Sequence, residues 1–127
     1  MIRLKSNVFP DVLRNYGFVK ASELADKERA YESVGYGYKA DWWVKHLLED
    51  TETGEYVIEP NENTVIAYAD EDFDQPMVTI SYRPEWNDFY ISCVPSDSYK
   101  IGGWDLEIIP NTFYRLAVDG LIEDTEV

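Results

Sequence analysis

Carboxylates are the side chains in this chain with the most evident chemistry. The stretch between His46 and Tyr82 holds ten carboxylates and no lysine or arginine: Glu49, Asp50, Glu52, Glu55, Glu59, Glu62, Asp70, Glu71, Asp72 and Asp74. Two neighbouring carboxylates can act as the acid and the base of a hydrolase, but this stretch offers many candidate pairs and no distinguishing spacing. Crowded like charges repel each other unless a cation compensates them, so docking of a cationic partner is the leading hypothesis. The alternative is a surface that only keeps the protein soluble.

Asp70, Asp72 and Asp74 alternate in the manner of a calcium-binding loop. Such a loop needs glycine at its sixth position and glutamate at its twelfth, and this chain has Gln75 and Ser81 there. The sequence therefore predicts no calcium sensor, no metal centre and no cofactor.

His46 and Cys93 are each the only residue of their type, and a histidine beside a cysteine can activate a nucleophile. Cys93 alternates with Phe89 and Ile91, which indicates a buried position on a strand. His46 alternates with Trp42, Val44 and Leu48, so we interpret it as a core or edge histidine. The common catalytic and nucleotide-binding motifs are absent, and we expect a protein that is not an enzyme.

The adjacent Trp42 and Trp43 and the turn residue Trp86 could stack against a sugar, a base or a partner protein. Neighbouring strand residues point to opposite faces, so at most one of the pair belongs to the core. Exposed aromatic side chains beside carboxylates also suit a protein interface. We therefore include Trp43 and Trp86 among the candidate partner-binding residues.

The charge is divided unevenly along the chain. Residues 1–45 have a net charge of +2, residues 46–127 have −16, and the total is −14. Such a charge disfavours direct binding to nucleic acid or to an anionic membrane. A single cysteine and the lack of a long apolar run favour a cytoplasmic protein.

The first residues predict helices. Asn7–Tyr16 has apolar residues at helical spacing, Pro10 in its first turn and Gly17 as a left-handed stop. Ser22 can cap a second helix that continues to about Glu32. A last helix is expected over Thr112–Asp119.

The middle of the chain predicts strands. Trp42–Leu48 also fits a short helix, but the turn-like residues 50–54 after it favour a strand that enters a hairpin. Further strands are expected at Tyr56–Ile58, Thr64–Ala69, Met77–Tyr82, Asp88–Val94 and Trp104–Ile109.

These elements predict a single α+β domain over residues 1–127. Its antiparallel sheet of four to six strands, between about Trp42 and Ile109, is flanked by N-terminal helices and a C-terminal helix. We expect a non-enzymatic acidic module that binds a basic protein surface, similar in type to small acidic inhibitors of phages and mobile elements. The alternatives are a carbohydrate- or small-ligand-binding module with exposed aromatic residues and a carboxylate-pair hydrolase. The predicted partner-binding residues are Glu49, Asp50, Glu52, Glu55, Asp70, Glu71, Asp72, Asp74, Trp43 and Trp86.

Overall fold

The computed structural model describes residues 1–24, 38–70, 73–93 and 107–125. Within these residues it consists mostly of short antiparallel strands, with one α-helix, α2 (Ile108–Val118), and two 3-10 helices, η1 (Pro10–Tyr16) and η2 (Ala21–Glu23). The strands are β1 (Ile2–Leu4), β2 (Val19–Lys20), β3 (Trp43–His46), β4 (Leu48–Asp50), β5 (Tyr56–Val57), β6 (Thr64–Ile66), β7 (Tyr68–Asp70), β8 (Phe73–Pro76), β9 (Val78–Arg83), β10 (Asp88–Cys93) and β11 (Ile122–Asp124).

The largest sheet has four strands in the order β10-β9-β3-β2, and every neighbouring pair is antiparallel. Trp43, Tyr82 and Phe89 are opposite one another in register, and they share the face that packs on the core. Because side chains alternate along a strand, Arg83, Asp88 and Tyr90 lie on the other face. One face of the β9–β10 hairpin therefore packs on the core, and the opposite face carries Arg83, Asp88 and Tyr90.

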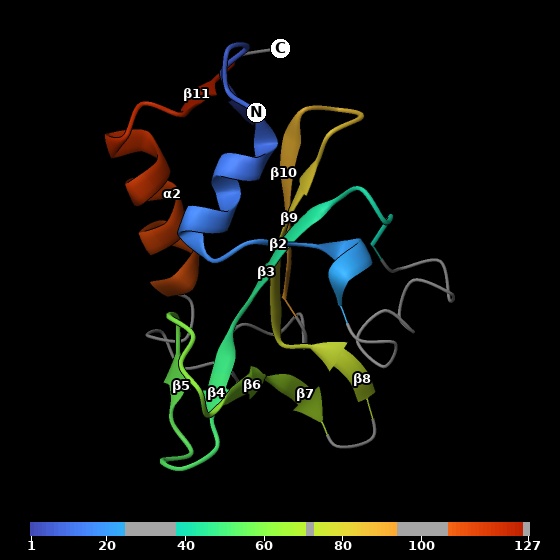
Figure 1. The fold of residues 1–127 in the computed structure, drawn as a ribbon, viewed down its shortest axis with the longest axis vertical. Helices are drawn as coiled ribbons and strands as arrows, with labels where there is room; N and C mark the ends of the chain where they lie inside the picture. The colour runs from blue at the N-terminus through green and yellow to red at the C-terminus, as the bar shows by residue number, and fades with distance from the viewer. Residues whose placement is uncertain (25–37, 71–72, 94–106, 126–127) are drawn as a thin grey trace.

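Three further small sheets complete the described structure. They have the orders β5-β4-β6, β7-β8 and β1-β11. Figure 1 shows β4, β5, β6, β7 and β8 together at the lower end of the molecule, and the turn between β9 and β10 at the upper end.

The chain passes between sheets at three buried residues. Leu47, Ala67 and Met77 each separate two consecutive strands and are almost fully buried. Their backbones are joined, because the Ala67 N–H donates to the Leu47 carbonyl and the Met77 N–H donates to the Ala67 carbonyl, at 3.0 and 2.8 Å. These bonds satisfy polar groups that burial would otherwise leave unpaired.

The core lies between the four-stranded sheet and a layer formed by η1 and α2. Figure 1 shows α2 and η1 beside each other on one side of the strands. Phe18, Leu13 and Leu116 are buried there with Ile80 and Ile108 of the sheet and helix. Burying such side chains contributes about 1.5–3 kcal/mol each to the free energy of unfolding.

Most of the antiparallel strands predicted between Trp42 and Cys93 are confirmed, including the strand interpretation of Trp42–Leu48, but the prediction of one continuous sheet is wrong. Trp42–Leu48 and Thr64–Ala69 each change sheet at a buried residue, so each forms two short strands. Alternation of apolar and polar residues continues through such a bend, and the sequence pattern therefore does not reveal it.

The predicted helices are only partly correct. The first is a 3-10 helix over Pro10–Tyr16 that ends, as expected, at a left-handed Gly17 with φ of 90°. The second does not begin at Ser22, since η2 ends at Glu23 and Leu24 is extended; residues 25–32 lie outside the described residues.

The C-terminal helix begins earlier than predicted. Residues 104–106 are outside the described part, but Ile108 and Ile109, expected on a strand, form the first turn of α2. Ile108, Thr112 and Leu116 are buried at helical spacing, so their burial decides the conformation. Glu107 stands at the N-cap position.

Candidate functional site

The β4–β5 hairpin carries four of the predicted site residues. Glu52 and Glu55 are exposed in its loop, while Glu49 and Asp50 at the end of β4 are partly buried. Asp50 organises this loop, since its carboxylate accepts hydrogen bonds from the Asn61 amide at 3.1 Å and from the N–H groups of Glu52 and Thr53. These hydrogen bonds, that of Asn61 foremost, hold the pKa of the Asp50 carboxyl below its ordinary value.

The second predicted acidic loop is described only at its margins. Asp70 ends β7 and Asp74 lies within β8, and these two strands pair as a hairpin. Glu71 and Asp72 lie outside the described residues. Both acidic hairpins belong to the group of strands at the lower end of Figure 1, so the two predicted loops arise from the same end of the molecule.

Most of the positive charge that the structure describes is already paired with a carboxylate. Each of the four described arginines contacts a carboxylate, in the pairs Arg3–Glu123, Arg14–Glu23, Arg83–Asp88 and Arg115–Glu59. In the part of the chain that the structure describes, Glu49, Glu52, Glu55 and Glu62 make no ion pair. The β4–β5–β6 end therefore has negative charge that the described residues do not compensate with an ion pair.

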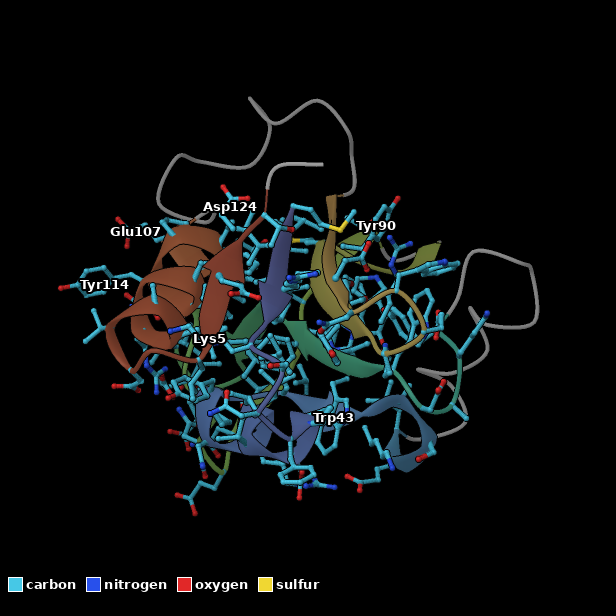
Figure 2. The ribbon with its side chains drawn as sticks, turned by 90° about the horizontal axis from the view of Figure 1, so that it is seen from above. Lys5, Trp43, Tyr90, Glu107, Tyr114 and Asp124 are labelled. Atoms are coloured by element: carbon cyan, nitrogen blue, oxygen red, sulfur yellow. The ribbon has the colours of Figure 1, made fainter. Side chains whose placement is uncertain are left out.

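Trp43 does not belong to this surface. It is only 5% exposed, belongs to the core, and its ring is covered by the Arg14 guanidinium at 4.9 Å. Figure 2 shows Trp43 within the molecule, between the N-terminal 3-10 helix and the strands. The reason is the register of β3, which places Trp43 opposite Tyr82 on the core face. We therefore remove Trp43 from the candidate partner-binding residues.

Trp86 lies in a separate cluster at the turn between β9 and β10. Its side chain is 55% exposed, and the Arg83 guanidinium carbon lies 4.5 Å from its ring centroid. The same guanidinium lies 4.9 Å from the ring centroid of Tyr90, which is 50% exposed. Because this turn is at the upper end of Figure 1, Trp86 and the acidic hairpins do not form one continuous surface.

Arg83 is fixed in this cluster by Asp88. The Arg83 Nε and Nη2 groups donate to the two Asp88 carboxylate oxygens at 2.8 and 2.6 Å. The bidentate bond to Asp88 is the main reason that the pKa of Arg83 is raised. The sequence contained a signal for this ion pair, because an arginine and an aspartate stand on either side of the Pro-Glu-Trp-Asn turn.

His46 is a core histidine, as the sequence predicted. It is buried, and its Nε2 lies 2.9 Å from the Tyr38 hydroxyl, within hydrogen-bond distance. Burial lowers the pKa of His46 to about 4. Cys93 ends β10 at the position paired with Val78, whereas His46 pairs with Thr79.

Lys45 is a buried cation that sequence reasoning missed. Its side chain is 2% exposed, and its Nζ donates to the Thr112 hydroxyl of α2 at 2.8 Å. Burial lowers the pKa of Lys45 to about 8, against the opposing influence of Glu59. The alternation Trp43, Lys45, Leu47 places this lysine on the core face and was the available signal.

A pocket of about 320 Å³ lies between β5 and the start of α2. Its lining consists of the buried Leu47 and of Tyr56, Val57, Ile58, Glu59, Glu107 and Asn111. Among the described residues no group of three or more histidine, cysteine, aspartate or glutamate side chains is arranged to hold a metal ion.

In the described residues, no helix combines the length and the apolar character needed to cross a membrane. No family model matches the chain, and no curated protein or solved structure matches it significantly.

Proposed function

We propose that this protein is a non-enzymatic binding module whose acidic end docks a basic surface of another protein. The observation that carries the proposal is the difference in pairing between its charges. The described arginines are all paired internally, whereas Glu49, Glu52, Glu55 and Glu62 have no cationic partner in the described structure.

The field of this end supports such a role. Unpaired carboxylates on neighbouring strands and loops repel one another, and a cationic surface relieves that repulsion. Complementary charge raises the association rate of two proteins more than it raises their affinity. A protein that inhibits or regulates a nucleic-acid-binding protein would compete for the same basic surface, and we include this class in the proposal.

The first experiment identifies a basic partner and measures how the acidic end contributes to its binding. Proteins retained from a host lysate at about 50 mM salt and released at about 500 mM are purified, and their association rates are measured by surface plasmon resonance. Glu52→Lys with Glu55→Lys reverses two loop charges. Asp11→Lys with Asp41→Lys is the matched control, because both residues are exposed and lie outside the acidic end.

We expect the Glu52→Lys, Glu55→Lys variant to associate several-fold more slowly than the control at low salt, with a smaller difference at high salt. Stability should change little, since exposed charges contribute about 0–1 kcal/mol each to the free energy of unfolding. Equal rates for the two double variants would contradict the proposal, and so would tight binding of the wild-type protein to duplex nucleic acid in place of a protein.

A further inference from the structure

The exposed aromatic residues of the β9–β10 hairpin belong to an alternating stack of cations and rings. The Lys39 Nζ lies 5.3 Å from the ring centroid of Trp86, and the Arg83 guanidinium lies 4.5 Å from the same centroid. Arg83 also lies over the ring of Tyr90 at 4.9 Å. The order Lys39–Trp86–Arg83–Tyr90, which we name the cation–ring stack, thus ends on an aromatic ring that is half exposed.

From this arrangement, we propose that the exposed part of Tyr90 receives an arginine side chain of a basic protein, as the next cation in the stack. A guanidinium that lies over a tyrosine ring is attracted by the negative face of the ring. The site is distinct from the acidic end and does not depend on the function proposed above.

Carboxylates neutralise the cations that are already in the cation–ring stack, so a further cation can bind beside them without strong repulsion. Asp88 binds Arg83 through both carboxylate oxygens, and the Glu85 carboxylate lies 3.8 Å from the Lys39 Nζ. The charges of the stack therefore cancel locally, while the whole chain has a net charge of −14. An incoming guanidinium meets little repulsion from Arg83 and gains from the field of the molecule.

The stack is also held in place before any partner arrives. The Trp42 Nε1 donates to the Glu85 carboxylate at 2.8 Å, which fixes the residue that pairs with Lys39. Asp88 is buried and lies directly opposite Arg83 in the hairpin register. Side chains that are already ordered lose less conformational entropy on binding. Tryptophan, tyrosine and arginine are also the residues that most often dominate interface energies.

The test compares a short peptide of alternating glycine and arginine with the same peptide carrying citrulline, which keeps the side-chain shape and removes the charge. Binding of the labelled peptides is measured by fluorescence anisotropy for the wild-type protein and for Tyr90→Leu, Tyr90→Phe and Tyr114→Leu. Tyr114 is a matched control, because it is 71% exposed on α2 and Figure 2 shows it on a different side of the molecule from Tyr90. Peptide binding by all variants is also measured in the Glu52→Lys, Glu55→Lys background. This comparison distinguishes binding at Tyr90 from binding at the acidic end.

We expect Tyr90→Leu to weaken binding of the arginine peptide about two- to fivefold in both backgrounds, as a partly exposed cation–ring contact implies. Tyr90→Phe keeps the ring and should bind as the wild type does, and Tyr114→Leu should have no effect. In the wild-type protein, NMR signals of the Tyr90 ring should shift with the arginine peptide and not with the citrulline peptide.

Equal binding by the Tyr90→Leu and Tyr90→Phe variants would overturn the inference. So would Tyr90 signals that respond to a neutral oligosaccharide or to self-association and not to the arginine peptide. If the acidic end fails its own test while Tyr90 behaves as expected, the function proposed above is wrong and this inference stands.

Discussion

Lys45 allows a direct test of how a buried charge affects stability, because its ammonium group is buried and its pKa is lowered. Burial lowers its pKa from 10.5 to about 8 in the folded protein. The unfolded chain therefore binds more protons than the folded protein between these two values, and stability rises with pH in that range. The protonated lysine destabilises the folded state at neutral pH, and this cost disappears as the folded protein loses the proton.

The size of the effect follows from the two pKa values of Lys45, 10.5 and about 8. Integrating the difference in bound protons from about pH 7 to about pH 9.5 gives roughly 2 kcal/mol of added stability. In the Lys45→Met variant the buried charge is absent, the side chain keeps a similar volume, and this gain should vanish. At about pH 7 the variant should be as stable as the wild type or more stable, although the bond to Thr112 is lost.

The assay is urea unfolding of the wild type and of Lys45→Met at both pH values, followed by circular dichroism. A change of roughly 2 kcal/mol shifts the urea midpoint by about 1 M. Lys39→Met serves as the control for other titrating groups, since the Lys39 side chain is 61% exposed. Parallel pH dependence of the wild type and Lys45→Met would refute the reasoning.

Two other positions give predictions of comparable size. Burial lowers the pKa of His46 to about 4, against 6.5 in the unfolded chain, so stability should fall by about 2 kcal/mol between about pH 7 and pH 5. His46→Asn should not show this loss in urea unfolding, and an equal loss in that variant would contradict the assignment. Asn87 has a φ of 47°, and its side chain accepts a hydrogen bond from the Tyr82 hydroxyl and donates one to the Leu4 carbonyl. Asn87→Ala should cost about 2–4 kcal/mol of stability, and Asn87→Gly about 1 kcal/mol less because glycine adopts positive φ freely. Thermal unfolding of both variants measures this difference, and equal losses would show that the backbone conformation contributes nothing.

The sequence predicted the kinds of elements better than their grouping. Alternating residues identified most strands between Trp43 and Cys93, and Gly17 ended the first helix in the left-handed conformation. The division into several sheets depends on backbone bonds among Leu47, Ala67 and Met77, which are distant in sequence. A pattern read along the chain contains no information about such contacts.

The start of α2 was mispredicted for a related reason. Trp104–Ile109 alternates as a strand does, while Ile108, Thr112 and Leu116 repeat at helical spacing. Both patterns use Ile108, and its burial with Leu116 in the core shows that the helical pattern prevails from this residue onward. Local periodicity cannot choose between two faces when only the tertiary core determines which one is covered.

A count of the charges in the candidate site does not show which carboxylates are already bound within the fold. Glu49–Glu62 reads as one acidic run, yet its members have different surroundings in the fold. Asp50 accepts three hydrogen bonds that shape its loop, and Glu59 is bound by the Arg115 guanidinium at 2.8 Å. Glu52 and Glu55 are exposed and have no ion pair in the described structure. A cationic partner gains most from carboxylates whose charge is not already satisfied, because the others must first give up an internal bond. The contribution of each carboxylate to docking should therefore follow its pairing in the fold rather than its place in the run.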